Sequence, residues 1–537
     1  MTSGTGPARH TVRDRSHALL RRHGVSVIFG NPGSNELPFL QDLPDDVDYV
    51  LGLHEGAVVG MADGYAQATG RPAFVSLHAA SGTGNAMGAL TNAVSSHTPL
   101  VLLAGQQVRA TLGLEPMLAN VDAALLTRPL TRWSSEPACA TDVPRALNQA
   151  FAEAVRDGGG PVYLSVPYDD WDRDAAPGDR HLLGRSVVEC RDAPEPVVAG
   201  LVERLDAAAH PVLVLGPTLD TGAGYAAGVR LAEALGAAVW VSPSTHRMPF
   251  PNRHPLFRGV LPAAVAHVSE LLAGHDLVLV AGAPVFRYHQ HVPGDYLARG
   301  THLVHLTDDG GEAARAPMGE AVVADVVGTL TRLADGVRPR GVAVGAYTEP
   351  APARAGGDGR LDPEEVFATV RETAPADTAY VVESTSTNAA FWAQMDLRQP
   401  QSYFWPASGG LGFGLPAAVG VRMGLGERPV VALVGDGSAN YGITALWTAA
   451  QQRVPVVFVI LNNGTYGALR WFADLLGVPK APGLDVPGID FVQLGQGYGV
   501  PSARASDVAG LRRLLAEGLA SDGPSLIEVP TTLTTPH

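Results

Sequence analysis

Short apolar runs rich in valine, isoleucine and leucine recur along the whole chain, and a segment with helical periodicity follows most of them. Runs of this kind, bounded by glycine, proline or aspartate, are typical of strands buried on both faces. Their alternation with helices predicts βαβ units and parallel sheets. The predicted strands are residues 27–29, 49–53, 73–77, 100–104, 162–166, 212–215, 238–241, 277–281, 303–306, 379–382, 430–434, 456–461 and 525–529.

Two polar stretches divide this pattern into thirds. The first runs from residue 170 to residue 196, and the second, rich in glycine, alanine, proline and arginine, covers residues 341–360. Segments of this composition act as linkers. Directly after the second stretch, Asp362 and Pro363 suit the N-cap and first turn of a new helix. The sequence therefore predicts an α/β fold of three domains with parallel sheets flanked by helices, at residues 1–182, 190–340 and 362–537, with a linker at 341–361.

Composition and charge exclude several classes of function. The 537 residues carry a net charge of −15, which argues against a nucleic-acid partner. Neither the N-terminus nor the longest apolar stretches have the length of a signal peptide or a membrane span. The two cysteines, Cys139 and Cys190, are too few for a disulfide framework or a zinc cluster. We therefore expect a cytoplasmic protein without a membrane partner.

Two polar clusters come directly after neighbouring predicted strands, and residues 440–451 between them predict a single helix. The clusters are Gly435-Asp436-Gly437-Ser438 and Asn462-Asn463-Gly464-Thr465. Either cluster alone would be an ordinary turn. In one βαβ unit, however, both loops leave the same edge of the sheet, so Asp436 and Asn463 should converge. Carboxylate, amide and carbonyl oxygens are ligands that Mg²⁺ shares with phosphates, and the glycines allow close backbone approach.

The spacing of these clusters resembles a known motif. Gly-Asp-Gly, 24 intervening residues and Asn-Asn are similar to the thiamine-diphosphate motif of the superfamily that contains pyruvate decarboxylase and acetolactate synthase. The resemblance implies that Asp436, Asn463 and a backbone oxygen of Thr465 hold Mg²⁺ (or Ca²⁺). It further implies a last domain that binds the diphosphate, and cofactor contacts from Leu411, Gly435, Gly437, Ser438 and Tyr466.

Glu55 is the candidate for activating the cofactor. It stands between the predicted strand 49–53 and a predicted helix over residues 56–69, where a lone glutamate would usually serve the helix dipole. The string from His54 to Ala66 resembles the glutamate helix of the same superfamily. This implies that Glu55 contacts the aminopyrimidine ring, in the first domain, and promotes formation of the thiamine ylid.

Four further strings resemble the benzoylformate decarboxylases: residues 30–38, 77–85, 167–171 and 284–290. The resemblance implies that Ser34 binds the substrate carboxylate. His78 would move a proton to and from the substrate oxygen, and His289 would protonate the enamine left after CO₂ departs.

The same resemblance implies a substrate pocket whose apolar and aromatic side chains suit an aryl ring. Besides Ser34, the pocket residues would be Met117, Leu118, Thr385, Trp405, Leu469 and Phe472. Met117 and the pair Trp405-Pro406 depart from the family pattern, which leaves the identity of the keto acid open.

The expected function is therefore non-oxidative decarboxylation of an aryl 2-keto acid, with benzoylformate giving benzaldehyde and CO₂ through a thiamine ylid and an enamine. The main alternative is a thiamine-dependent carboligase or lyase of the acetolactate-synthase or benzaldehyde-lyase type, which would share the same cofactor residues. A flavin-bearing synthase and a non-catalytic assembly protein are further alternatives. The family places its thiamine site between the first domain of one chain and the last domain of another, which implies at least a homodimer and favours a homotetramer, a dimer of dimers.

Overall fold

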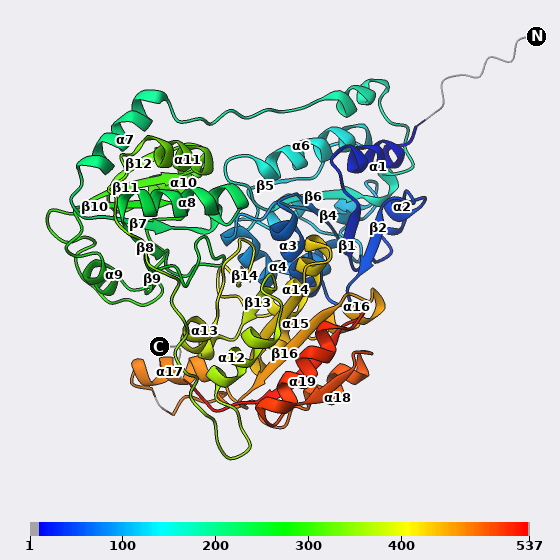
Figure 1. Ribbon diagram of the computed structural model, residues 1–537. Coiled ribbons are helices and arrows are strands. Elements are labelled where there is room, and N and C mark those ends of the chain that lie inside the picture. Colours follow the sequence, from blue (N-terminus) through cyan, green and yellow to red (C-terminus); the bar gives the residue numbers. More distant parts are fainter. Residues whose placement is uncertain (1–9, 479, 535–537) are drawn as a thin grey trace, which may run out of the picture. The chain divides into compact units, whose positions relative to one another are not determined.

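Three six-stranded sheets with helices between their strands make up the part of the chain that the computed structural model describes, residues 10–478 and 480–534 (Figure 1). Every strand pair of known register in these sheets is parallel. The α/β class expected from the alternating apolar runs is confirmed. No helix among the described residues is both long and apolar enough to cross a membrane.

The described residues form two compact units. The first joins the described residues up to 188 with residues 408–505 and 513–530. The second consists of residues 189–407 and 506–512 together with the described residues from 531 onward. The first unit therefore holds the first sheet and the strands that carry the predicted diphosphate motif.

The first sheet has the strand order β2-β1-β3-β4-β6-β5. Its elements are α1 (Val12–Arg22), β1 (Val27–Gly30), α2 (Leu37–Leu40), β2 (Asp48–Leu51), α3 (Glu55–Thr69), β3 (Ala73–Leu77), α4 (Ala79–Ser95), β4 (Leu100–Gln106), α5 (Ala123–Leu126), β5 (Trp133–Ser135), α6 (Val143–Val155) and β6 (Val162–Pro167). β3 and β4 are buried along their whole length, as expected for strands with helices on both faces. Because β1, β2 and β3 are parallel neighbours, the turns that carry Glu36, Glu55 and His78 leave the sheet at one edge.

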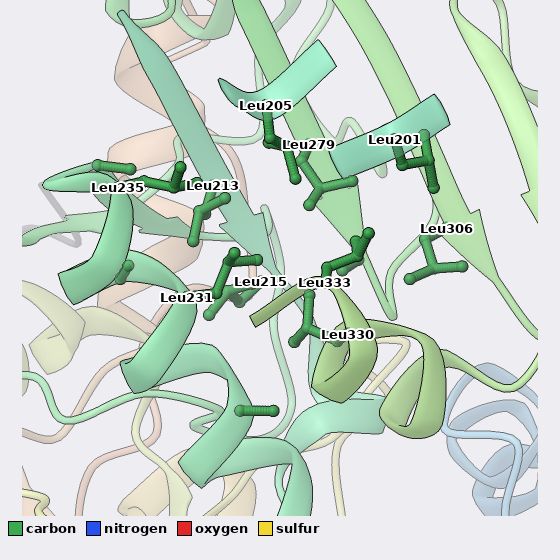
Figure 2. Packing of buried hydrophobic residues seen from close by; sticks show 14 of the residues in the cluster. Leu201, Leu205, Leu213, Leu215, Leu231, Leu235, Leu279, Leu306, Leu330 and Leu333 are labelled. Atoms are coloured by element: carbon green, nitrogen blue, oxygen red, sulfur yellow. The ribbon is translucent and has the colours of Figure 1, made fainter. Parts of the chain in front are cut away.

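The second sheet, in the second unit, has the order β12-β11-β10-β7-β8-β9. Its elements are α7 (Glu195–Ala207), β7 (Pro211–Leu215), α8 (Gly222–Leu235), β8 (Ala238–Val241), β9 (Phe257–Val260), α9 (Val265–Leu271), β10 (Leu277–Ala281), β11 (His302–Thr307), α10 (Gly310–Arg315), β12 (Glu320–Val323) and α11 (Val326–Gly336). Leucines of β7, β10 and β11 pack against leucines of α7, α8 and α11, as Figure 2 shows. This apolar layer holds the helices on one face of the sheet.

The third sheet has the order β14-β13-β15-β16-β18-β17. Its elements are α12 (Pro363–Thr373), β13 (Ala379–Glu383), α13 (Asn388–Gln394), β14 (Tyr403–Phe404), α14 (Gly414–Leu425), β15 (Val430–Gly435), α15 (Asp436–Gly442), α16 (Ala445–Gln451), β16 (Val456–Asn462), α17 (Gly467–Leu475), α18 (Phe491–Gly497), β17 (Ser502–Arg504), α19 (Val508–Leu519) and β18 (Ser525–Pro530). Asp362 caps α12 through a capping box and Pro363 opens the helix, as predicted.

Helices α3 and α14, both in the first unit, approach each other backbone to backbone. A Cβ atom on Gly64 would lie 2.3 Å from the carbonyl oxygen of Ala417, and one on Gly420 would lie 1.8 Å from that of Met61. Only glycine allows such an approach. The contact fixes α3, the helix that begins at Glu55, against α14. Helix α14 follows the glycine loop at residues 409–412.

Five strands were missed in the sequence, namely β5, β9, β12, β14 and β17, and each lies at an edge of its sheet. None is longer than four residues, and most are partly exposed. An edge strand is covered on fewer sides than a central one, so it needs no long apolar run. The missing apolar signal is the physical reason that these strands were not predicted.

The single helix expected over residues 440–451 is wrong. The segment forms two short helices, α15 and α16, and the first of them already begins at Asp436. Gly442 ends α15 where a Cβ atom would lie 2.7 Å from Cδ of Pro416. The β-branched residues Ile443 and Thr444, which favour helices only weakly, fill the break. The diphosphate motif therefore forms the first turn of a helix of its own.

A buried ion pair holds together the part of the second unit that leads to Trp405. The carboxylate of Asp220, 1% exposed, accepts from Nε of Arg247 at 2.7 Å, and the guanidinium lies 4.1 Å from the ring centre of Phe404. The second carboxylate oxygen accepts from the backbone N–H of Gln401 at 2.9 Å. The pair therefore ties the turn that follows β7 to the segment that precedes Trp405.

We expect Asp220→Ala to lower the midpoint of thermal unfolding by about 10 °C, because removing one member of a buried pair leaves an uncompensated charge at a cost of roughly 3–5 kcal/mol. Differential scanning calorimetry measures this shift. The matched control is Asp335→Ala, which removes a pair with Arg230 whose side chains are 58% and 51% exposed. The control should change the midpoint by less than about 2 °C. Equal midpoints for the two variants would show that the buried pair does not stabilise the unit.

Candidate active site

Asp436 connects the two polar clusters directly. It is 3% exposed and begins α15 at the end of β15. One carboxylate oxygen accepts the N–H of Gly437 at 2.8 Å, and the other accepts the N–H of Gly464 at 2.7 Å. Burial raises the pKa of Asp436, and the hydrogen bonds from Gly464 and Gly437 oppose that rise. Asp436 of the first loop thus contacts Gly464 of the second. The two loops therefore converge, as expected from the βαβ geometry.

The loop after β16 is folded tightly around Asn463 and Thr465. The amide oxygen of Asn463 accepts the N–H of Thr465 at 3.0 Å, and Gly464 has the left-handed φ of +75° that this turn requires. The hydroxyl of Thr465 donates to the carbonyl of Leu484 at 2.7 Å and accepts from Nε of Arg470 at 2.7 Å. These contacts hold the loop in one conformation.

The donor groups of these two loops fit a hard divalent cation bound together with a diphosphate. They offer a buried carboxylate, an amide oxygen and backbone carbonyls, all of which are oxygen ligands. Gly437 lets the ring of Tyr466 come close, since a Cβ atom there would lie 2.6 Å from that ring. Ser438 is buried in the same turn and Gly435 is half-buried. Every residue predicted for the diphosphate site in these loops thus belongs to one connected structure.

Glu55 is held by two amide groups. Its carboxylate is 5% exposed. One oxygen accepts from Nδ2 of Asn31 at 3.1 Å and the other from Nδ2 of Asn85 at 3.0 Å. A Cβ atom on Gly82 would lie 2.9 Å from the first oxygen, so α4 packs directly against the carboxylate. The turn after β1 and helix α4 therefore fix the orientation of Glu55.

His78 precedes α4 and is paired with a carboxylate. Its Nδ1 lies 2.9 Å from Oε2 of Glu36, and its side chain is 21% exposed. Ser34 is exposed in the turn that also carries Glu36, and its hydroxyl donates to the side-chain oxygen of Asn35 at 3.3 Å. The turns after β1 and β3 thus bring Ser34, Glu36 and His78 to the edge of the sheet where Glu55 lies.

The glycine loop with Leu411 is anchored by Asn92 of α4. Nδ2 of Asn92 donates to the carbonyl of Gly410 at 2.8 Å. Its Oδ1 accepts from the N–H groups of Ser408 and Gly410 at 3.1 and 3.2 Å. Gly412 has a φ of +98°, and Leu411 between these glycines is half-buried. One side chain of α4 thus sets the position of the loop that carries Leu411.

The remaining predicted pocket residues lie in separate segments. In the first unit, Met117 is 87% exposed and Leu118 is 42% exposed with a φ of +66°. Leu469 and Phe472 lie on α17, and Leu469 is 49% exposed.

Three predicted residues belong to the second unit. Thr385 opens the turn after β13, and His289 is exposed after β10. Trp405 donates its backbone N–H to the carbonyl of His246 at 3.1 Å, and its ring stacks on that of Tyr403 at 6.4 Å.

Comparison with known proteins assigns each third of the chain to one group of enzymes. Residues 10–125 match the thiamine pyrophosphate enzyme N-terminal binding domain, residues 198–333 the central domain, and residues 384–529 the C-terminal binding domain. A benzoylformate decarboxylase from Pseudomonas aeruginosa is 58% identical over 97% of this chain and 99% of its own length. The chain belongs to the thiamine pyrophosphate enzyme family.

Further members of this family differ in activity. A putative acetolactate synthase large subunit from Mycobacterium tuberculosis is 32% identical over 94% of this chain and 96% of its own length. Among solved structures, a thiamine diphosphate-dependent 4-hydroxybenzoylformate decarboxylase from Rhodococcus jostii superimposes with a TM-score of 0.96 at 57% identity, over 98% of this chain and 99% of that one. The chain is therefore far more similar to the aryl keto acid decarboxylases than to the synthase.

Sequence reasoning passed over several residues that shape this thiamine enzyme's site. They are Asn31 and Asn85, which hold Glu55, Glu36, which pairs with His78, and Asn92, which anchors the glycine loop. Three of them stand inside the strings that carried the family resemblance. Polar residues in such strings were a usable signal, because Asn31, Glu36 and Asn85 all hydrogen-bond to a predicted site residue or lie within hydrogen-bond distance of one.

Proposed function

We propose that this thiamine enzyme decarboxylates an aryl 2-keto acid without oxidation and converts benzoylformate to benzaldehyde and CO₂. The observation that carries the proposal is the near-complete alignment with a benzoylformate decarboxylase at 58% identity, together with a structural neighbour that acts on the 4-hydroxy derivative. The proposal is supported by the held carboxylate of Glu55 and by the joined loops of Asp436 and Asn463, which would serve the cofactor and its metal in such a reaction.

Asp436, Asn463 and the backbone oxygen of Thr465 would hold Mg²⁺, which in turn would bind the diphosphate. Thiamine diphosphate, when bound, supplies the carbanion that attacks the keto acid and the ring that accepts the electrons of the broken C–C bond. Glu55 would hold a proton against the aminopyrimidine ring, a role for which its fixed, buried carboxylate is suited. Leu411 would contact the cofactor from the loop that Asn92 anchors.

Ser34 would bind the substrate carboxylate by donating from its hydroxyl. His78 would move a proton to and from the substrate oxygen, and His289 would deliver the proton that replaces CO₂. Histidine suits both roles because it gives and takes protons near neutral pH.

We expect His289→Ala to lower kcat by about 10²–10⁴-fold, the usual contribution of one acid or base, with a smaller effect on KM. Steady-state kinetics with benzoylformate measures both values. His291→Ala is the matched control, since His291 is also exposed in the same loop. A variant of His289 with the wild-type kcat would remove this histidine from the mechanism.

The choice of substrate tests the proposed pocket. Its residues would be Ser34, Met117, Leu118, Thr385, Trp405, Leu469 and Phe472. Aldehyde release is measured from benzoylformate, 4-hydroxybenzoylformate, phenylpyruvate, pyruvate and a branched aliphatic keto acid. The highest kcat/KM should belong to an aryl acid with the keto group next to the ring. Preference for pyruvate would contradict the aryl pocket and keep only the thiamine chemistry.

A carboligase activity is the second candidate, because the acetolactate synthase relative shares 32% identity with nearly the whole chain. The discriminating measurement is product analysis with pyruvate and with benzoylformate. A decarboxylase releases free aldehyde as its main product, whereas a carboligase releases mainly the hydroxyketone formed from two substrate molecules.

We also infer a homotetramer, a dimer of dimers, in the cytoplasm. Exposed apolar side chains on two segments of the first unit support self-association, since exposed apolar patches mark interaction surfaces. They are Leu114, Met117, Val121 and Leu125 on one segment and Leu475, Leu476 and Val478 on the other. Light scattering coupled to gel filtration tests the assembly, and a monomer would contradict it. Cell fractionation tests the location, and recovery outside the cytoplasm would contradict it.

A further inference from the structure

Glu36 has no part in the function proposed above, yet its carboxylate is held by three donors. Its side chain is 2% exposed. Oε1 accepts the backbone N–H of Gly105 at 2.9 Å, and Oε2 accepts that of Gly33 at 2.8 Å. The same Oε2 lies 2.9 Å from Nδ1 of His78. The carboxylate therefore joins the turn after β1, the end of β4 and the imidazole of His78.

These contacts determine which nitrogen of His78 carries the hydrogen. An ionised carboxylate can only accept hydrogen bonds, so the hydrogen in the contact with Glu36 belongs to Nδ1. The neutral imidazole then keeps its lone pair on Nε2, and the protonated ring carries its second N–H there. Nε2 is the nitrogen that is left to exchange a proton with a substrate.

Two glycines make room for this arrangement. A Cβ atom on Gly33 would lie 2.0 Å from Nδ1 of His78, and one on Gly105 would lie 2.2 Å from Oε1 of Glu36. No other residue at either position would leave the imidazole and the carboxylate where they are. The backbone is thus shaped around the pair, and the pair is more than a chance contact of two side chains.

The other titratable groups nearby do not compete with Glu36 for His78. Burial, followed by the charge of Glu36, raises the pKa of Tyr49, and burial raises the pKa of Tyr163 to about 12, so both phenols stay neutral near neutral pH. Glu136 accepts from Gln106 and Ser165 instead, at 3.0 and 2.9 Å. Glu55 is occupied by two asparagine amides.

We propose that Glu36 is a positioning residue for proton transfer: by accepting from Nδ1 it fixes the ring and the tautomer of His78 and presents Nε2 to the substrate. The inference rests on the proposed function, because His78 must exchange a proton with the keto acid oxygen. Glu36 touches neither the substrate nor the cofactor in this mechanism. It acts only through the imidazole.

A double-mutant cycle separates this role from a general structural one. The four proteins are wild type, Glu36→Gln, His78→Ala and the variant with both changes, each assayed with benzoylformate. Glu36→Gln should lower kcat by about 10–100-fold, with a smaller change in KM, since directly coupled residues commonly interact at this level. In the His78→Ala background the same change should have little further effect, below about threefold. Equal losses in both backgrounds would overturn the proposal, because Glu36 would then act without His78.

The pH profile gives a second readout that loss of packing alone would not move. Glu36→Gln removes the carboxylate that faces the imidazole of His78, so the alkaline limb of the kcat profile should move to lower pH. Glu36→Asp, which keeps the charge, should retain the wild-type limb even if its melting temperature falls. An unshifted limb in Glu36→Gln would contradict the proposal.

The cycle also separates failure of the inference from failure of the function. If wild type does not decarboxylate benzoylformate, the proposed function fails. If wild type is active and His78→Ala is equally active, the role of His78 fails and the inference with it. If His78→Ala is impaired and the two changes multiply, only the role of Glu36 fails.

Discussion

Replacing Glu55 by glutamine should lower kcat for benzoylformate by about 10²–10⁴-fold, the contribution expected of a single acid–base group. Glutamine has the size of glutamate but cannot take up or release a proton at the cofactor's aminopyrimidine ring. The fold should be retained, because Asn31 and Asn85, which now donate to the carboxylate, can rotate their amides to match the new one.

The measurement combines kcat with the thiamine diphosphate Kd and the melting temperature of Glu55→Gln. We expect the latter two values to stay close to those of wild type. Glu203→Gln serves as the matched control, since Glu203 is exposed on α7. A Glu55→Gln enzyme with kcat within threefold of wild type would falsify the assignment of Glu55 as the activating group.

Replacing Asp436 by alanine should weaken Mg²⁺ binding in the presence of thiamine diphosphate by more than about 100-fold. Removing a residue that only hydrogen-bonds to a metal ligand already weakens metal binding roughly 10–100-fold. Asp436 is proposed as a direct ligand, so its loss should have a larger effect. The change also removes the acceptor of the N–H groups of Gly437 and Gly464, which join the two loops. Both the ligand and the order of its surroundings are therefore lost.

Isothermal titration of Mg²⁺ into metal-free protein with thiamine diphosphate gives this affinity directly. Asp474→Ala is the control, because Asp474 is exposed on α17, which begins close after the metal loop. Unchanged Mg²⁺ affinity in Asp436→Ala would place the metal elsewhere. A weaker affinity in the control as well would indicate a general effect of charge.

The convergence of Asp436 and Asn463 could be predicted because it depends on local order along the chain. Two buried strands that are joined by a helix and run parallel must bring their loops to one edge. Val430–Gly435 and Val456–Asn462 carry this information in long apolar runs. The same reasoning predicted the class of the fold.

The contacts within the site could not be predicted in this way, because they join residues far apart in the chain. Nothing in the spacing of Glu36 and His78 indicates that they pair, or that Asn92 anchors the loop around Gly410. The break between α15 and α16 could not be predicted from the local sequence either. α15 ends at Gly442, and the packing of Pro416 where a side chain of that residue would be is a contact that the local sequence does not show.

The central claim is tested most directly by measuring the release of benzaldehyde from benzoylformate. The protein is first freed of metal and cofactor, and the release is measured before and after thiamine diphosphate and Mg²⁺ are added together. The account predicts no benzaldehyde at first and full turnover once both have been added, with CO₂ released in equal amount. Turnover that does not depend on the cofactor, or a fully loaded enzyme that releases no benzaldehyde, would contradict it.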